Sequence, residues 1–371
     1  MRHNVSELLY QHEPLADKIK AMHERLLRSV PVIDRVACVL YDARSDLLKT
    51  FINSTRQGIP INGYEFALAE STSLSRLAET GDCRVIDDIA EVIRPDSPHS
   101  SWLLEQGYQS SFTVPLFDFE AFAGFVFFNS MQAAAFTPER QRDALMFANL
   151  LGMAILTERM LVRNILQSAN VAREVARLRD FETGAHLDRM AHYSRLIAKG
   201  VADIYALNDE FIEHVFLFAP LHDIGKVGIP DAILLKPGRL DKDEWQIMQS
   251  HVELGLQLAD RVITELKLAD HADSKIIRNL IGGHHEMLDG SGYPAGLKGE
   301  QVPIEARIVT VSDIFDALTT ERPYKQAWPF EEAFAELDRM AAAGKIDPCC
   351  VAALKSESDK ARVIHSANPD R

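Results

Sequence analysis

Hydrophobic residues in the first part of the chain occur in short runs separated by a helical pattern. Residues 36–42 (VACVLYD) form an apolar run that ends at a turn, as a buried strand does. Residues 73–81 (SLSRLAETG) have the pattern of a helix that a glycine ends. Residues 110–116 and 123–129 are apolar, aromatic-rich runs in close succession, which is typical of a hairpin. The pattern therefore predicts a mixed α and β domain over residues 1–150.

A long helix is predicted next. Thr137 is suited to the N-cap, Pro138 to the first helical position and Glu139 to an acidic first turn. Residues in alternating steps of four and three then follow, all apolar except Glu158: Leu151, Ile155, Glu158, Val162, Ile165, Ala169, Ala172 and Ala176. This is the spacing of a coiled-coil seam, so we expect a signalling helix over residues 151–180 that forms a parallel homodimer. A helix buried against its own domain is the alternative.

Helical patterns continue to the end of the chain. They are separated by loops at residues 236–238, 289–303 and 344–348. The sequence therefore predicts an all-α bundle over residues 181–371, after the α+β domain and the linker helix.

The composition is that of an ordinary globular protein, with 371 residues and a net charge of −14. This acidic balance argues against a polymeric nucleic acid as partner. The N-terminus has no apolar signal-peptide core, and the apolar stretch at 144–156 is shorter than the ~20 residues of a membrane span. We therefore expect a cytoplasmic protein with no membrane contact. The four cysteines have no CxxC spacing, which argues against a thiolate zinc site.

Paired histidines are the strongest chemical signal. His284 and His285 run into a glycine-rich turn (residues 284–294, HHEMLDGSGYP), and a His222-Asp223 pair lies upstream. A protein core rarely contains adjacent histidines, because each brings a polar nitrogen that needs a partner. The pattern favours a polynuclear metal centre with a loop over it, rather than a surface turn with incidental histidines.

Further blocks accompany this stretch in a fixed order. They are residues 182–186 (ETGAH), 222–231 (HDIGKVGIPD), His251, 284–294, 313–319 (DIFDALT) and 322–325 (RPYK). Together they resemble the HD-GYP family, a branch of the HD metal-dependent phosphohydrolases that degrades cyclic di-GMP. The resemblance extends from about Asn170 to the C-terminus.

The resemblance implies a set of metal ligands that are all nitrogen or oxygen donors: Glu182, His186, His222, Asp223, His251, His284, His285 and Asp313. Such donors suit Fe, or alternatively Mn, and are also compatible with Zn, Co or Ni. Eight ligands are too many for one ion, so two are expected. In the family an acidic residue at the position of Glu182 accompanies a third ion.

The family also implies roles in catalysis and substrate binding. A metal-activated hydroxide would open cyclic di-GMP to pGpG, and a further cleavage would give GMP. Asp223 and Lys226 are expected to be catalytic, with Lys226 close to the phosphoryl oxygen. The other expected residues are Tyr293, Arg322 and Lys325 for substrate binding, Gly290, Gly292 and Pro294 for loop shape, and Asp316 as an acceptor behind the metal ligands.

One residue departs from the family pattern. Met287 stands where the family usually has arginine after His-His-Glu. The glycine-rich loop is also where the family contacts protein partners, so this change bears on loop order or partner recognition. It removes no metal ligand.

The first domain resembles a GAF domain, a sensory module with an antiparallel sheet between helices, over about Leu26 to Leu156. The Asn-Lys…Phe…Asp-Glu signature of cyclic-nucleotide-binding GAF domains is absent, so an unidentified small ligand is expected. Cys83 and His99 could contact it, although ordinary loop or core roles suit them better.

Two other functions remain open. One is a catalytically weak cyclic di-GMP receptor that signals by conformation. The other is a different HD-type nucleotide phosphohydrolase, such as a nucleotidase or an alarmone hydrolase.

Overall fold

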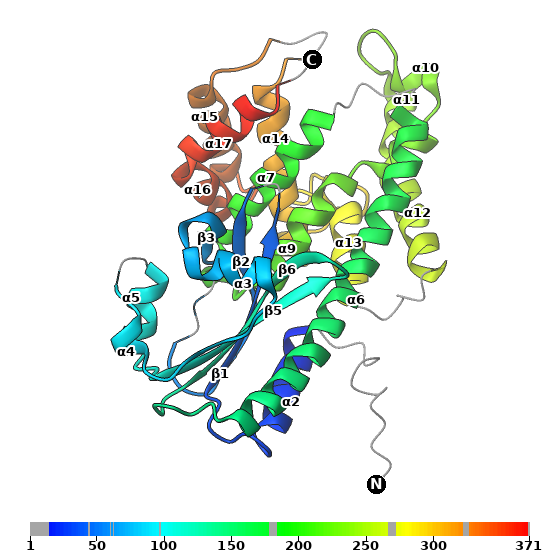
Figure 1. Cartoon of the computed structure of the whole chain (residues 1–371). Helices are drawn as coiled ribbons and strands as arrows, with labels where there is room; N and C mark the ends of the chain where they lie inside the picture. The colour runs from blue at the N-terminus through cyan, green and yellow to red at the C-terminus, as the bar shows by residue number, and fades with distance from the viewer. Residues whose placement is uncertain are drawn as a thin grey trace. The chain divides into compact units, whose positions relative to one another are not determined.

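The computed structural model describes residues 15–43, 45–59, 61, 63–95, 98–177, 184–265, 272–321 and 326–369 (Figure 1). The chain divides into two compact units, residues 1–160 and 161–371. The described part of the first unit combines a sheet with helices, and that of the second is helical. The predicted order of an α+β domain followed by an all-α bundle is confirmed.

One antiparallel sheet organises the first unit. In its described residues the strands are β1 (Arg35–Asp42), β2 (Leu47–Thr55), β3 (Glu65–Ala67), β4 (Arg84–Ile86), β5 (Ser110–Asp118) and β6 (Ala121–Ser130). Their order across the sheet is β3-β2-β1-β6-β5-β4, and each neighbouring pair is antiparallel. The helices are α2 (Leu15–Leu26), α3 (Thr72–Thr80), α4 (Ile89–Val92), α5 (Pro98–Glu105) and α6 (Pro138–Arg177), with the 3-10 turn η1 (Leu68–Glu70).

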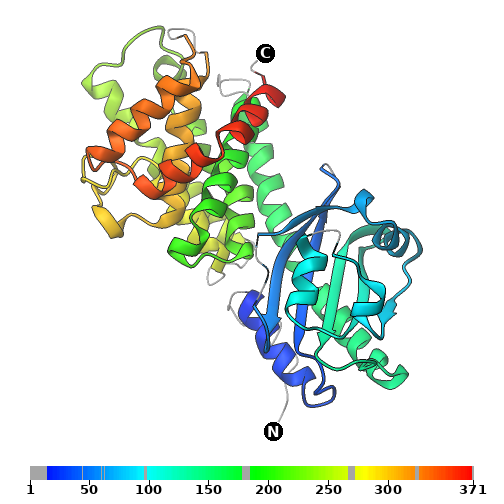
Figure 2. The same ribbon diagram turned by 90° about the vertical axis from the view of Figure 1, so that its left-hand side faces the viewer.

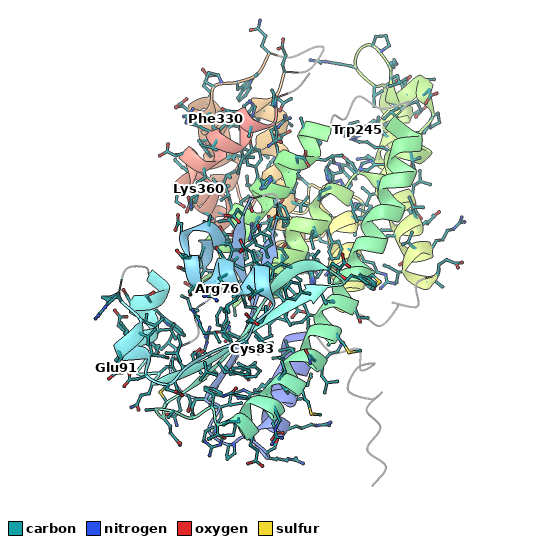
Figure 3. All side chains as sticks on the ribbon, viewed as in Figure 1. Arg76, Cys83, Glu91, Trp245, Phe330 and Lys360 are labelled. Carbon is teal, nitrogen blue, oxygen red and sulfur yellow. The ribbon has the colours of Figure 1, made fainter. Side chains whose placement is uncertain are left out.

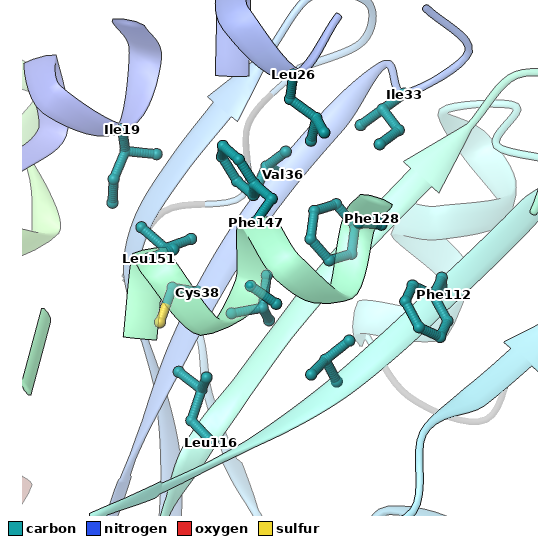
Figure 4. Packing of buried hydrophobic residues seen from close by; sticks show 14 of the residues in the cluster. Ile19, Leu26, Ile33, Val36, Cys38, Phe112, Leu116, Phe128, Phe147 and Leu151 are labelled. Carbon is teal, nitrogen blue, oxygen red and sulfur yellow. The ribbon is translucent and has the colours of Figure 1, made fainter. Parts of the chain in front are cut away.

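Side-chain alternation gives this sheet two apolar faces. On β6, Val126 and Phe128 belong to the cluster on one face, and Phe125 and Phe127 to the cluster on the other. Helices α2 and α6 cover the first face (Figure 1). The packing there includes Ile19 of α2, Val36 and Cys38 of β1, Phe112 of β5, and Phe147 and Leu151 of α6 (Figure 4). Helix α3 packs on the second face through residues such as Leu77.

The elements predicted in this unit are present. The run at 36–42 is β1, and the runs at 110–116 and 123–129 are the paired strands β5 and β6. The helix expected at 73–81 is α3, and Gly81 ends it with a φ of 74°. This left-handed conformation favours glycine, so the predicted glycine end of the helix is confirmed.

Helix α6 begins at Pro138 as predicted, and the amide of Arg140 donates to Thr137 Oγ1 (3.5 Å). Leu151 and Ile155, the first positions of the expected dimer seam, are fully buried in the core of the first unit. At these two positions α6 packs on its own domain, as in the alternative interpretation. Glu158, Val162 and the later seam positions lie outside the described side chains.

The second unit is built around α14 (Ile304–Thr319), which packs against α7, α13, α15 and α16 (Figure 2). Its other described elements are α7 (Gly184–Gly200), α8 (Ala202–Tyr205), α9 (Asp209–Phe218), η2 (Ala219–Leu221), η3 (Ile224–Gly228), α10 (Asp231–Leu234), α11 (Lys242–Gln249), α12 (His251–Glu265), α13 (Ala272–Gly283), η4 (Gly299–Gln301), α15 (Phe330–Ala342), α16 (Pro348–Ser356) and α17 (Ser358–Ala367). Phe315 of α14 is fully buried between Tyr193 of α7 and Phe334 of α15. Among the described residues, no helix has both the length and the apolar character that a membrane crossing requires.

We expect Phe128→Ala to lower the free energy of unfolding by about 3–5 kcal/mol, because it leaves a cavity at a fully buried position. Phe119→Ala is the matched control, since the Phe119 side chain is 94% exposed, and its effect should stay within about 0.5 kcal/mol. Urea denaturation of the full chain measures both. Equal effects of the two variants would contradict this packing.

Candidate metal centre

Seven of the eight expected ligands converge in the second unit, in two groups. One group is Asp223, His251, His284 and His285, and the other is His186, His222 and Asp313. Within each group the ligand atoms lie within 4.8 Å of one another. The groups adjoin, since the rings of His222 and His284 have centroids 5.1 Å apart. The eighth residue, Glu182, lies outside the described residues.

Three of these histidines follow the end of a helical segment. His222 follows η2, His251 follows α11, and His284 follows α13. In each ring, Nδ1 donates to the backbone carbonyl three residues earlier, at distances of 2.9, 2.7 and 2.9 Å. Each imidazole therefore bonds a carbonyl in the last turn of the preceding helical segment, where intrahelical bonding ends. A carbonyl only accepts, so a neutral ring that donates through Nδ1 has its lone pair on Nε2.

These Nε2 atoms point at one another and at a carboxylate. Asp223 Oδ1 lies 3.0 Å from His251 Nε2 and 3.5 Å from His284 Nε2, and the two nitrogens are 3.4 Å apart. Asp223 Oδ1 is buried and has no hydrogen-bond partner. Three acceptor atoms that face one another repel each other when no proton lies between them. A cation between the three atoms removes this repulsion. The residues therefore fit a divalent metal ion.

Asp223 lies between the two groups. Its Oδ1 faces His251 and His284, and its Oδ2 lies 3.1 Å from His222 Nε2 in the other group. Lys226 Nζ is 2.8 Å from the same Oδ2 and keeps part of its side chain exposed. A carboxylate in this position can be shared by two ions, as the adjacent His222-Asp223 pair suggests.

The turn that carries Asp223 and Lys226 packs directly on α12. A Cβ atom on Gly225 would overlap the backbone of His251 and Gly255, so this position requires glycine. The close approach brings the carboxylate of Asp223 within reach of His251.

His186 is oriented by a buried carboxylate. Its Nδ1 donates to Asp316 Oδ2 (2.7 Å), which leaves Nε2 for the second group. Arg189 holds this carboxylate through Nε to Oδ1 (2.6 Å) and Nη2 to Oδ2 (3.0 Å), and also donates to Thr320 Oγ1 and to the carbonyl of Asn368. Asp316 thus accepts the Nδ1 hydrogen of His186, a ligand candidate of the second group. Arg189 was not anticipated, although it lies one turn after His186 on α7.

Local electrostatics favour the deprotonated forms that bind metal. Burial lowers the pKa of His284 and of His285, the latter to about 3 with a contribution from His284, so both rings are neutral at pH 7. Burial raises the pKa of Asp223, but Lys226 and His222 outweigh it and the pKa lies well below its usual range. For Asp313, His222 likewise outweighs burial and lowers the pKa.

The glycine-rich loop is fastened over the first group. Glu286 is almost fully buried and accepts the amides of Ala295 (2.7 Å), Gly296 (3.1 Å) and Leu297 (2.9 Å). Gly292 packs so closely on the backbone of His285 and Met287 that a Cβ would overlap it. The Tyr293 ring stacks on His285, with centroids 4.6 Å apart. Sequence reasoning missed Glu286, although its place inside the His-His-Glu run was a signal.

Met287 has a different role from a loop anchor. Its side chain is partly buried against the core cluster that α7, α14, α15 and α16 form. Glu286 supplies the anchoring bonds of the loop instead. The departure from the family pattern therefore leaves the loop fastened to the centre.

Arg322 and Lys325 lie outside the described residues, so their expected contacts stay predictions. Among the other loop residues, Gly290 has a φ of 82°, which favours glycine. Pro294 follows Tyr293 directly in the loop over His285.

Residues 170–350 match the family model of the HD domain. The second unit therefore contains an HD domain. The matched range contains every candidate ligand, including the adjacent His222 and Asp223, which belong to different groups.

Curated relatives match about half of the chain. The chain is 44% identical over 177 residues to the cyclic di-GMP phosphodiesterase response regulator RpfG of Xanthomonas campestris, covering 47% of this chain and 43% of that protein. It is 41% identical to a cyclic di-GMP phosphodiesterase of Thermotoga maritima (44% and 41% covered) and 40% identical to the 3'3'-cGAMP-specific phosphodiesterase 2 of Vibrio cholerae (52% and 34%). The chain thus spans less than half the length of these relatives.

Solved structures are similar to part of the chain as well. One is the phycocyanobilin-bound GAF domain of a cyanobacterial phytochrome, with 20% identity and a TM-score of 0.34, covering 43% of this chain and 98% of that one. Another is the GAF domain of an Acinetobacter phosphoenolpyruvate-protein phosphotransferase, with 13% identity and a TM-score of 0.33, covering 42% and 90%.

We expect Arg189→Gln to weaken metal binding at the group of His186, His222 and Asp313 by about 10–100-fold, because the carboxylate that orients His186 loses its support. Arg195→Gln is the matched control on the same helix, since Arg195 lies 3.7 Å from Glu213 and touches neither group. Elemental analysis of both purified variants, with metal titration by calorimetry, measures the effect. Unchanged metal content in Arg189→Gln would contradict the positioning role.

Proposed function

We propose that the HD domain is a metal-dependent phosphodiesterase that hydrolyses a 3′,3′-linked cyclic dinucleotide, with cyclic di-GMP as substrate. The observation that carries the proposal is the position of Asp223 between two adjoining groups of ligand candidates. Metal ions held by these two groups would supply an activated water and would stabilise the attacking and leaving oxygens of a phosphodiester. The names of the similar curated proteins support this substrate class.

In the proposed reaction a water oxygen adds to phosphorus and the bond to the 3′-oxygen breaks. The water proton ends on that oxygen, and the linear dinucleotide pGpG results. Hydrolysis of its remaining linkage gives GMP. Lys226 is placed to assist, because its ammonium reaches Asp223 Oδ2 (2.8 Å) from a partly exposed position. There it can donate to the phosphoryl oxygen on which negative charge builds.

Aromatic rings next to the centre offer a surface for a guanine base. Tyr293 lies on His285, and its ring is 6.4 Å from that of Trp245. Trp245 lies on α11 (Figure 3). Trp245 is 48% exposed, so its ring is accessible to a base. Burial and the charge of Asp223 raise the pKa of Tyr293, so its phenol stays protonated and can donate a hydrogen bond.

We propose Fe as the native metal, with Mn as the alternative, since all donors are nitrogen or oxygen. Zn, Co and Ni are compatible with the same donors. A third ion would use Glu182, and Arg322 and Lys325 would hold phosphate oxygens; these roles rest on the family resemblance. They are part of the proposal for the complete site.

Two partner interactions complete the proposal. The later part of the helix over residues 151–180 would pair with a second copy in a parallel homodimer. A protein partner would contact the glycine-rich loop, which Glu286 fastens to the centre. Both rest on the family resemblance and the heptad spacing.

A second candidate substrate is 3'3'-cGAMP, because Vibrio cholerae relatives at 40% and 41% identity carry that name. It shares the two phosphodiester groups of cyclic di-GMP and differs in one base. A receptor without turnover and a phosphohydrolase of mononucleotides or alarmones are the remaining alternatives.

Anaerobically purified, metal-loaded protein should convert cyclic di-GMP to pGpG or GMP, because the centre offers two adjoining groups of ligand candidates. Chromatography after parallel incubations with cyclic di-GMP, 3'3'-cGAMP, a deoxynucleoside triphosphate and ppGpp measures the preference. Faster turnover of either of the last two would point to another phosphohydrolase. Binding of cyclic di-GMP without any product would move the protein to the receptor class.

Lys226→Met should lower kcat roughly 10²–10³-fold with unchanged metal content, because a donor to the phosphoryl oxygen is lost. Lys355→Met is the control, since Lys355 pairs with Asp338 on an exposed surface. Steady-state kinetics together with elemental analysis separate a loss of catalysis from a loss of metal. A kcat equal to that of the parent would remove Lys226 from the reaction.

A further inference from the structure

A cavity lies in the first unit, on the face of the sheet opposite α2 and α6. Its volume is about 150 Å³, a size at which a cavity accepts a single aromatic ring. Most of its wall is apolar and includes Leu48, Phe127 and Ile86. Two arginines, Arg35 and Arg84, also line it. A cavity of this size with two cations in its wall needs an explanation.

Arg35 on β1 is only 2% exposed. Its Nη1 donates to Asn129 Oδ1 (2.8 Å), and its guanidinium lies 4.8 Å from the centroid of the Trp102 ring. Its Nε is buried and has no hydrogen-bond acceptor. The contacts of this cation are therefore with an amide and an aromatic ring, both uncharged.

Arg84 on β4 is held in a similar way. Its Nη1 donates to the Ser73 hydroxyl, and its Nη2 to Thr113 Oγ1 (3.5 Å). Its Nε is also buried and without an acceptor. Within the described ranges of the chain, neither Arg84 nor Arg35 forms an ion pair with a carboxylate.

Burial of two cations without an anion is unfavourable, since buried charges in proteins are normally paired. Burial lowers the pKa of both guanidinium groups, that of Arg35 to about 10, so both remain charged at neutral pH. An anion inside the cavity would supply acceptors for the two Nε atoms and a charge of opposite sign. The two arginines therefore indicate that a ligand of this cavity is negatively charged.

We propose that this cavity binds a small organic anion, with its carboxylate or phosphate group between Arg35 and Arg84 and its apolar body against Leu48, Phe127 and Ile86. Guanidinium groups suit such anions because their planar donors match two oxygens at once. The volume restricts the body to about one ring or a short branched chain. Cys83, expected as a possible contact, is exposed and does not line the cavity (Figure 3). The side chain of His99 lies outside the described residues.

This inference is independent of the reaction proposed for the HD domain, because its test measures binding and not turnover. Metal-loaded full-length protein is titrated by calorimetry with benzoate, isovalerate and phenyl phosphate. Benzamide, the uncharged analogue of benzoate, is the control ligand. The variants are Arg35→Met and Arg84→Gln, with Arg76→Gln as the matched control because Arg76 is an exposed arginine on α3 that does not line the cavity (Figure 3).

At least one of the anions should bind and raise the Tm of the protein, and benzamide should bind at least about tenfold more weakly. Arg35→Met and Arg84→Gln should each weaken binding by about tenfold or more, and Arg76→Gln should leave it unchanged. Binding of benzoate or isovalerate alone would identify a carboxylate ligand, and binding of phenyl phosphate alone a phosphate ligand. Circular dichroism confirms that the variants fold.

Three results would overturn the proposal. One is that none of the three anions binds, and another is that benzamide binds as tightly as benzoate. The third is anion binding that survives in both arginine variants, which would place the anion elsewhere, such as at the metal centre. Each of these results can be interpreted whether or not the protein hydrolyses cyclic di-GMP.

Discussion

The metal centre depends on the convergence of acceptor atoms that have no proton to share. His251 Nε2, His284 Nε2 and Asp223 Oδ1 lie 3.0–3.5 Å apart in a buried space. Their opposite ring nitrogens already donate to backbone carbonyls, so neutral rings have no hydrogen left for the contact. Only a cation makes this arrangement favourable. The rest of the second unit can be understood as the scaffold that holds these atoms together.

That scaffold uses helix ends more than helix faces. His222, His251 and His284 each follow a helical segment, where a backbone carbonyl of its last turn orients the ring. His186 instead lies on a helix, and a buried carboxylate and a buried arginine orient it. Gly225 lets the turn with Asp223 approach α12. Substitutions at positions far in sequence from the ligand residues can therefore misplace a ligand without removing it.

The sequence predicted the α+β and all-α units and their order, because strand alternation and helical periodicity are local signals, and its histidine motifs contain the residues that the structure brings together. It could not assign the ligands to two groups, since that depends on how helix ends far apart in the chain meet. Arg189 was missed because its role appears only when Asp316, on another helix, lies beside it. Leu151 and Ile155 carried the spacing of a dimer seam, yet the same spacing suits the face that packs on the sheet. The two arginines of the cavity could not be recognised in the sequence, because their distinguishing feature is burial without a carboxylate partner.

The most direct test of the central claim is the position of the metal ions in crystals of protein loaded anaerobically with iron, located by anomalous scattering at the iron edge. We expect one peak bound by Asp223, His251, His284 and His285, and a second bound by His186, His222 and Asp313. Both peaks should lie at about 2.0–2.2 Å from their ligand atoms. Metal-loaded crystals without a peak between these atoms, or with peaks only elsewhere, would contradict it.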